Sequence, residues 1–186
     1  LAPLGGGRTL VLSIAAGTSL AAFEAALGQG TPVVRAMPNT PAAVGKGITA
    51  IVGNGAAGAG HLALAEALLS AVGEVVRLGS EAQLDAVTGL SGSGPAYVFH
   101  LIEALAAAGE AEGLPLDLSL RLARATVAGA GALAMETGED PAKLRCDVTS
   151  PAGTTQAGLR VLMAELPDLM RRTVAAAERS RELGRG

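Results

Sequence analysis

The sequence predicts two different parts in one chain: part of a doubly wound α/β domain in residues 1–79 and an all-helical domain in residues 80–186. In the first part, short β-rich apolar runs alternate with helical stretches, whereas from Ser80 onward the strand pattern disappears. Apolar side chains make up 49% of the 186 residues, which is enough to bury a sizeable core. The first part has few strands for a complete domain, and we expect the natural chain to begin upstream of Leu1.

Strands and helices alternate in the first part. Thr18 or Ser19 is placed to cap the first helix, which Gly28 and Gly30 end. A second amphipathic helix covers residues 61–72, with Gly73 as its C-cap. The first apolar run is typical of a strand buried on both faces, as in a parallel sheet. The predicted strands are residues 10–14, 33–37, 48–52 and 74–78.

Helix caps dominate the second part. Ser80 and Gln83 have the spacing of a capping box, in which each side chain satisfies the other residue's backbone N–H. The helices predicted after it run from Gly94-Pro95 to Gly113, from Asp117 or Ser119 to Gly138, from Asp140 to about Val148, and from about Pro167 to the end.

Composition excludes several functions. A net charge of −3 argues against a nucleic-acid or anionic-membrane surface, and 2% aromatic residues leave no platform for stacking bases. Charge-free stretches are broken by Gly, Asn, Ser and Pro, so we expect no membrane span. Nor does any His, Cys and carboxylate spacing indicate a metal site. One cysteine cannot form an internal disulfide, which favours a reducing cytoplasm.

Two segments in the first part have compositions that suit a ligand. Residues 13–17 (SIAAG) end a strand with small residues, so a flat ligand could approach the backbone at the carboxyl end of that strand. Residues 35–41 (RAMPNTP) follow the next strand, and their two prolines fix a loop that presents the Asn39 amide and the Thr40 hydroxyl. Either segment would also serve as an ordinary turn.

Two more segments lie in the second part. Residues 148–155 (VTSPAGTT) place small and hydroxyl-bearing residues before a helix, where outward N–H groups and the helix dipole favour a carboxylate or phosphate. Residues 88–95 (TGLSGSGP) interrupt the helical pattern with three glycines. That interruption would cradle a ligand or let two helices cross closely.

Taken in chain order, these motifs resemble those of pyrroline-5-carboxylate reductase, the last enzyme of proline biosynthesis. The resemblance extends through essentially the whole chain, although no GxGxxG follows a strand here. The chain is therefore similar to the C-terminal two-thirds of the family, without its glycine-rich pyrophosphate loop. This implies that residues 1–79 are the later part of a Rossmann-like NAD(P)-binding domain. Residues 80–186 then form a helical dimerisation and substrate-binding domain.

The resemblance also implies a reaction and its residues. NADPH or NADH delivers a hydride to the C=N carbon of 1-pyrroline-5-carboxylate, giving L-proline, in a homodimer or a higher homo-oligomer. Thr88 would hydrogen-bond the imine nitrogen. The substrate carboxylate would be held by Ser150, Ala152, Gly153, Thr154 and Thr155, and the nicotinamide side would be lined by Ala15, Ala16, Asn39, Thr40 and Pro41. Without the pyrophosphate loop, we expect the 186 residues alone to be inactive.

Two departures from the family pattern and two alternatives remain at this point. Ala152 stands where the family commonly has glycine, and an alanine would be strained there if the position needs a positive φ. Asp147 stands where the family usually has an amide. The chain could instead be a catalytically silent oligomerisation module, since Ala- and Gly-rich helices dimerise well. A related hydroxy-acid reductase would need a lysine on the long helix, and residues 95–112 contain none.

Overall fold

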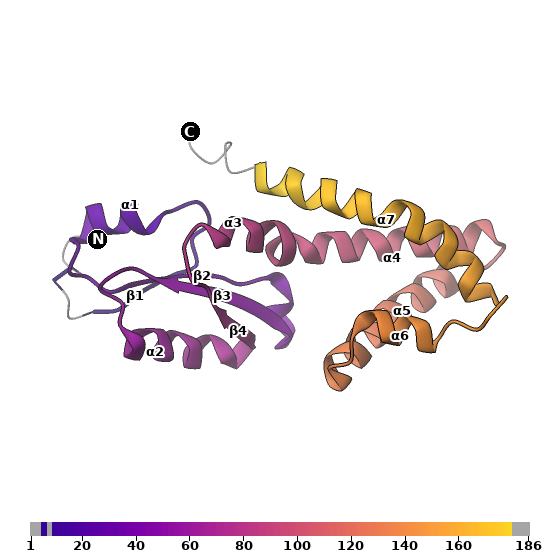
Figure 1. Cartoon of the computed structure of the whole chain (residues 1–186), viewed down its shortest axis with the longest axis horizontal. Coiled ribbons are helices and arrows are strands. Elements are labelled where there is room, and N and C mark those ends of the chain that lie inside the picture. The colour runs from indigo at the N-terminus through magenta and orange to yellow at the C-terminus, as the bar shows by residue number, and fades with distance from the viewer. Residues whose placement is uncertain (1–4, 7–8, 180–186) are drawn as a thin grey trace. The chain divides into compact units, whose positions relative to one another are not determined.

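The computed structural model describes residues 5–6 and 9–179. These residues form two compact units (Figure 1). The first comprises the described residues up to Pro95 together with the end of the last helix from Thr173, and the second comprises residues 96–172. None of the described helices has an apolar stretch long enough to cross a membrane.

A four-stranded sheet forms the centre of the first unit, in the order β1-β2-β3-β4. Its strands are β1 (Val11–Ser13), β2 (Val33–Met37), β3 (Gly47–Gly53) and β4 (Gly73–Arg77). Helix α1 (Leu20–Leu27) lies on one face and α2 (Ala59–Leu69) on the other (Figure 1). All four predicted strands and both helices are therefore confirmed, with helices on both faces as in a doubly wound domain.

The core follows the alternation of side chains along the strands. On the α1 face, Val33 and Val52 pack with Phe23, and Leu84 of the following helix joins the same cluster. On the α2 face, Val34 and Ile51 are fully buried in a second cluster that contains Ala65. Because successive residues of β2 point to opposite faces, one short strand contributes to both cores.

The pairing within the sheet differs from the expected parallel arrangement. β1 pairs with β2 and β3 with β4 in parallel, but β2 and β3 are antiparallel. The link between β2 and β3 is residues 38–46, which contain only the short 3₁₀ helix η2 (Thr40–Val44). A parallel crossover needs a dozen or more residues, so this link permits only the antiparallel pair. β1 is also only partly buried, because it is an edge strand of the sheet described here.

A serine caps the start of α1, and glycines lie at the ends of the helical elements of this unit, as predicted. The Ser19 hydroxyl accepts the N–H of Ala22 at 3.1 Å, and Gly28 ends α1 with φ of 90°. The 3₁₀ turn η3 (Ser70–Val72) follows α2 and ends at Gly73. A Cβ on Gly73 would lie 2.0 Å from the carbonyl oxygen of Gly47, so the β3–β4 approach requires glycine there.

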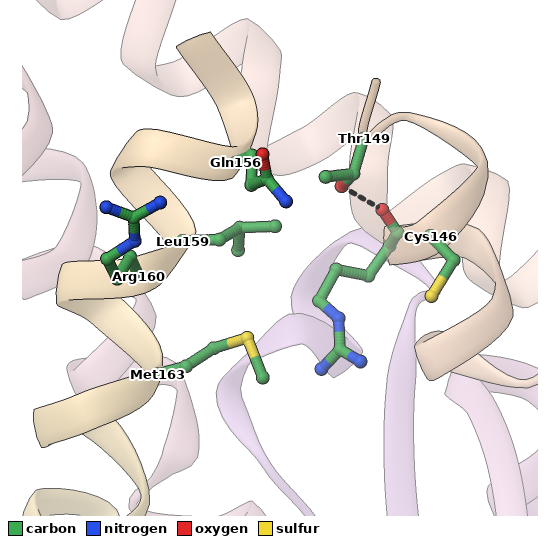
Figure 2. A pocket seen from close by; sticks show the side chains of 7 residues that line it. Cys146, Thr149, Gln156, Leu159, Arg160 and Met163 are labelled. Atoms are coloured by element: carbon green, nitrogen blue, oxygen red, sulfur yellow. Dashed lines mark hydrogen bonds between the residues drawn. The ribbon is translucent and has the colours of Figure 1, made fainter. Parts of the chain in front are cut away.

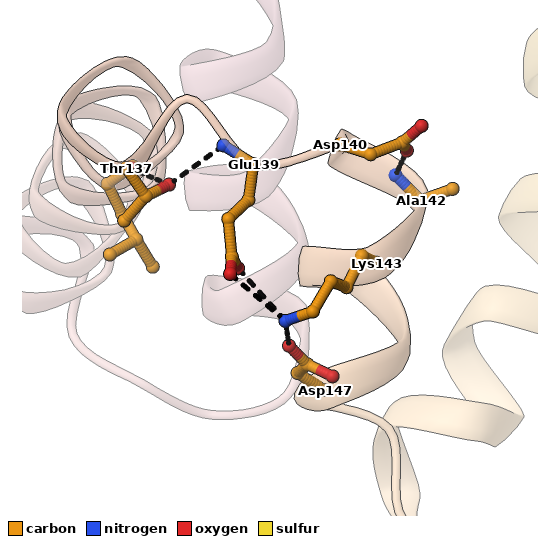
Figure 3. Close-up of polar contacts among 7 residues, drawn as sticks. Thr137, Glu139, Asp140, Ala142, Lys143 and Asp147 are labelled. Atoms are coloured by element: carbon orange, nitrogen blue, oxygen red, sulfur yellow. Dashed lines mark hydrogen bonds and ion pairs between the residues drawn. The ribbon is translucent and has the colours of Figure 1, made fainter.

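Every described element beyond β4 is helical, as expected. These elements are α3 (Gln83–Val87), the π-helical turn η4 (Thr88–Gly92), α4 (Gly94–Ala111), α5 (Leu116–Thr137), α6 (Pro141–Asp147) and α7 (Thr154–Arg179). Asp140 caps α6 by accepting the N–H of Ala142 at 2.7 Å (Figure 3). Gly138 ends α5 in the left-handed conformation that its prediction required.

Three helix starts differ from their predictions. Only half of the capping box forms: the Gln83 Oε1 accepts the N–H of Ser80 at 3.1 Å, but α3 has no side-chain cap. Helix α5 begins at Leu116, before Asp117, and Ser119 is buried within it. Helix α7 begins at Thr154, so Pro167 is an interior residue. Proline is favoured in a first turn but is tolerated inside a long helix when the remaining hydrogen bonds hold.

Candidate active site

Asn39 links two segments of the first unit. Its side-chain Oδ1 accepts the N–H of Ile48 at 3.0 Å, and its Nδ2 donates to the carbonyl of Ser91 at 3.2 Å. Thr40 and Pro41 follow it as the first residues of η2. The structure therefore brings the RAMPNTP loop together with the glycine-rich segment that contains Thr88.

Thr88 begins the π-helical turn η4. Its backbone carbonyl accepts the N–H of Ser93 at 2.8 Å, and its hydroxyl donates to the carbonyl of Leu84 at 2.7 Å. The hydroxyl proton is thus already used, and the oxygen retains lone pairs that can accept a further hydrogen bond. Single π-helical turns occur frequently at functional sites.

Ala15 and Ala16 are exposed residues that follow β1. The N–H of Ala15 donates to the Ser13 hydroxyl at 3.2 Å, and Gly17 has φ of 82°. Because β1 and β2 are parallel, these alanines and Asn39 follow the carboxyl ends of neighbouring strands. Ligands of open α/β sheets bind at this edge.

An ion pair fixes the helices beside this edge. The Arg35 guanidinium pairs with Glu81, whose Oε1 also accepts the N–H of Leu20 at 2.7 Å. The side chains of Arg35 and Glu81 are 15% and 30% exposed, so solvent screens the pair only partly. The pair joins β2 to the first residue of α1 and to the segment that precedes α3.

The loop between α6 and α7 contains the predicted carboxylate residues. Ala152 is the one described non-glycine residue with a positive φ, at 57°. Its N–H donates to the Gln156 Oε1 at 2.8 Å, and the N–H of Gly153 donates to the Ser150 carbonyl at 3.1 Å. A Cβ on Gly153 would lie 2.3 Å from the Ser150 Oγ and 3.1 Å from the Ser150 carbonyl oxygen, so a larger residue here would require the Ser150 side chain to move. The loop is therefore held in one compact shape.

The side chains of this loop face solvent in the single chain. Ser150, Ala152, Thr154 and Thr155 are exposed, and α7 begins at Thr154. The first N–H groups of a helix have no partner within the helix, and the helix dipole favours an anion beside them. Residues 150–155 thus combine hydroxyl groups with the start of a helix, an arrangement that favours an anion.

A pocket of about 270 Å³ lies between α6 and α7, next to this loop (Figure 2). The Thr149 hydroxyl on its wall donates to the Arg145 carbonyl at 2.6 Å. Gln156 both lines the pocket and holds Ala152. Sequence reasoning missed Gln156, because its role depends on the backbone conformation of a residue four positions earlier. The lining residues are Arg145, Cys146, Thr149, Gln156, Leu159, Arg160 and Met163.

Asp147, which precedes the loop, is paired with a lysine. Its carboxylate accepts from the Lys143 Nζ at 2.7 Å, and the same ammonium donates to Glu139 at 3.1 and 3.2 Å (Figure 3). The hydrogen bonds to Asp147 and then to Glu139 raise the pKa of Lys143. Lys143 of the same helix therefore offsets part of the charge of Asp147, because it also pairs with Glu139. Within the described residues, no group of three or more His, Cys, Asp and Glu could hold a metal ion.

The helical unit leaves much apolar surface uncovered in the single chain. Within α5 only Ser119 and Ala123 are buried, while Leu133 and Met135 are 50% and 70% exposed. Large apolar side chains exposed in such number favour an interface with another protein chain. Together, a sheet with a ligand edge and helices with uncovered apolar side chains define a class of protein with a ligand-binding α/β domain and a helical association domain. Other exposed apolar residues of this unit include Phe99, Leu101, Leu122, Val161, Leu162 and Leu169.

Comparison with known proteins identifies the family. Residues 81–183 match the family model for pyrroline-5-carboxylate reductase dimerisation. A pyrroline-5-carboxylate reductase of Synechocystis sp. is 49% identical, with 100% of this chain and 70% of that protein aligned. The pyrroline-5-carboxylate reductase of Pseudomonas aeruginosa is 45% identical, with 98% of this chain and 68% of that protein aligned. The chain belongs to the pyrroline-5-carboxylate reductase family, and it spans about two thirds of the length of these relatives.

Solved structures agree with this assignment. A pyrroline-5-carboxylate reductase from Coxiella burnetii superposes with a TM-score of 0.94 at 38% identity, over 98% of this chain and 68% of that one. A pyrroline carboxylate reductase from Plasmodium falciparum with NADP bound has a TM-score of 0.82 at 28% identity, over 95% of this chain and 71% of that one. The α/β-plus-helical fold, the oxidoreductase function in proline biosynthesis and the homodimerisation domain are thereby confirmed.

Proposed function

We propose that the protein reduces 1-pyrroline-5-carboxylate to L-proline through the residues predicted from its sequence. The observation that carries this proposal is the link between the Asn39 loop and the π-helical turn of Thr88, at the edge where β1 and β2 end. That arrangement collects the residues for the ring and the cofactor within one compact unit. We place the two domains at residues 1–79 and 80–186.

A nicotinamide ring fits the exposed edge after β1 and β2. Ala15 and Ala16 have no side-chain atoms beyond Cβ, so a flat ring can approach their backbone closely. Thr40 and Pro41, with Asn39, form the facing loop. NADPH or NADH, when bound, would supply the hydride, and these residues would lie against its nicotinamide ring. The choice between the two cofactors is left to the assay.

The substrate carboxylate is assigned to residues 150–155. The hydroxyls of Ser150 and Thr155 and the N–H groups of Thr154 and Thr155, at the start of α7, provide donors for its two oxygens. Ala152 and Gly153 shape the loop, because their N–H groups donate to Gln156 and to the Ser150 carbonyl. Fixing the carboxylate at one end orients the planar ring, and hydride transfer then depends mainly on positioning. The compact loop held by Gln156 suits that role, since its donors need little rearrangement on binding.

Thr88 is assigned to the ring nitrogen as a hydrogen-bond acceptor. Because its hydroxyl donates to the Leu84 carbonyl, its oxygen is free to accept the N–H of a protonated imine. The hydride adds to the C=N carbon, and the π electron pair of that bond moves to nitrogen. The nitrogen already carries its proton, so the product amine forms without a separate acid. This accounts for a site that depends on Thr88 rather than on a histidine or glutamate.

The single cysteine, Cys146, indicates the cellular compartment in which the protein works. It is a free, exposed thiol, and the chain has no second cysteine to pair with it. We therefore assign the protein to the reducing cytoplasm, where such a thiol persists.

The test is a steady-state assay of the natural full-length protein with 1-pyrroline-5-carboxylate and either NADPH or NADH. We expect cofactor oxidation coupled to L-proline formation, and a lower kcat in Thr88→Val, which keeps the shape of the side chain and removes the acceptor. Absence of turnover with both cofactors would favour the silent oligomerisation module. Turnover of a hydroxy acid instead would favour the related reductase. That the 186 residues alone are inactive stays a prediction, which the same assay on that chain would check.

A further inference from the structure

We propose that Asn39 is a positioning residue that fixes the π-helical turn η4, and with it the Thr88 hydroxyl, against the sheet. The proposal rests on the function assigned to Thr88 above. It changes the role expected for Asn39: the side-chain amide serves the turn and is not a hydrogen-bonding group for the cofactor.

Asn39 uses both ends of its amide within the protein. The Oδ1 accepts from Ile48 at the start of β3, and the Nδ2 donates to Ser91 within η4, 52 residues away in the sequence. Asn39 also occupies the N-cap position of η2, where an asparagine ordinarily caps its own helix. Its side chain makes no cap bond to η2. The amide is therefore committed to joining β3 and η4.

The carbonyl of Ser91 cannot have the donor that a regular α-helix would give it. In a regular α-helix it would accept the N–H of the residue four positions later, which is Pro95 and has no N–H. The Asn39 Nδ2 supplies a hydrogen bond to this carbonyl. Pro95, the second residue of α4, thus removes the partner that a regular α-helix would provide, and the loop after β2 provides a donor instead.

A second contact places the same turn against β2. A Cβ on Gly92 would lie 2.9 Å from the Met37 Cε and 3.7 Å from the Thr88 Cγ2, so Met37 packs directly on the turn. Asn39 and Met37 therefore hold η4 from one side through a polar and an apolar contact. Thr88 is the first residue of η4, so a shift of the turn moves its hydroxyl.

The sharpest variant is Asn39→Asp. Aspartate keeps the oxygen that accepts the N–H of Ile48, but it places a second oxygen opposite the Ser91 carbonyl, where the native amide donates. The matched control is Asn54→Asp. Asn54 accepts the N–H of Val33 at 3.0 Å and donates to the Thr31 carbonyl and to the Glu24 Oε1, each at 3.0 Å. Asn54→Asp therefore also replaces a donor by an acceptor, with an added repulsion from Glu24, and none of these hydrogen bonds involves η4.

We expect Asn39→Asp to lower kcat of the full-length homodimer roughly tenfold or more, since small misplacements of reacting groups have effects of that order. The KM for NADPH should stay within about twofold of the wild-type value. Asn54→Asp should lower the Tm and leave kcat per folded enzyme unchanged. An Asn39→Asp variant that raised the KM for NADPH at unchanged kcat would overturn the proposal, because it would indicate direct contact with the cofactor.

A double-variant cycle separates this proposal from the function it rests on. If Asn39 acts through Thr88, Asn39→Asp should lower kcat little further in a Thr88→Val background. Losses that multiply in the double variant would overturn the positioning role and leave the role of Thr88 intact. A Thr88→Val variant with wild-type kcat would refute the role of Thr88 itself, and with it the positioning role.

Discussion

Ala152 is the residue at which a single substitution should stabilise the protein. Its φ of 57° lies in the left-handed region, which an L-residue with a Cβ adopts at a cost of about 1–2 kcal/mol. Ala152→Gly removes that strain without removing a contact of the loop, because the Ala152 N–H to Gln156 bond is a backbone contact and remains possible.

The net gain is smaller than the strain. Glycine loses more conformational freedom on folding than alanine, by roughly 0.5–1 kcal/mol. The difference leaves about 0.5–1 kcal/mol in favour of Ala152→Gly. For a chain of this length, 1 kcal/mol corresponds to about 2–4 °C in Tm, so we expect a rise of about 1–4 °C.

Thermal unfolding at fixed protein concentration measures this rise, since the Tm of a homodimer depends on concentration. Ala164→Gly is the matched control: it makes the same chemical change within α7, where alanine is favoured, and should lower the Tm. A lower Tm in Ala152→Gly, or equal changes in the two variants, would refute the reasoning that Ala152 is strained.

Three further predictions concern the helical unit. Thr155→Val should raise the KM for 1-pyrroline-5-carboxylate by the equivalent of roughly 1–3 kcal/mol and leave the KM for NADPH unchanged, whereas equal losses would show that the loop is only structural. Asp147→Asn should lower the Tm only slightly at neutral pH, because the bridge to Lys143 is exposed. Hydrogen bonding raises the pKa of Lys143 in the folded protein above 10.5, so the stabilisation by the Lys143–Asp147 bridge is present below pH 10.5 and is lost as the pH rises through the folded-state pKa. A Tm difference between wild type and Asp147→Asn that persisted in stronger alkali would contradict this pH dependence. Leu133→Glu should shift the protein from dimer to monomer in sedimentation, and an unchanged dimer would exclude Leu133 from the interface.

Features with a local cause could be predicted from the sequence. The strand at residues 33–37 matches β2 at both ends, because an apolar β-rich run is stopped there by Pro38. Gly28, Gly73 and Gly138 were identified as helix ends, and each has a positive φ. The possible strain at Ala152 was also visible, since it follows from the identity of a single residue.

Features that depend on distant partners could not be predicted in the same way. The antiparallel β2–β3 pair follows from the length and the 3₁₀ conformation of residues 38–46, not from the strands themselves. The start of α7 was placed too late because Pro167 carries a local signal that long-range helix formation overrides. The bond from Asn39 to Ser91 crosses the sequence and has no periodic pattern, so the loop was recognised as a site while the function of its amide was not.

Isotope transfer tests the central claim most directly. The natural full-length protein is incubated with 1-pyrroline-5-carboxylate and NADPH that carries deuterium at the transferable position of the nicotinamide, and the product is examined by mass spectrometry and NMR. Direct hydride transfer to the C=N carbon predicts L-proline with one deuterium on Cδ, the ring carbon that is bonded to nitrogen and does not carry the carboxylate. L-proline without deuterium, or no L-proline under conditions in which the dimer is folded, would contradict the account.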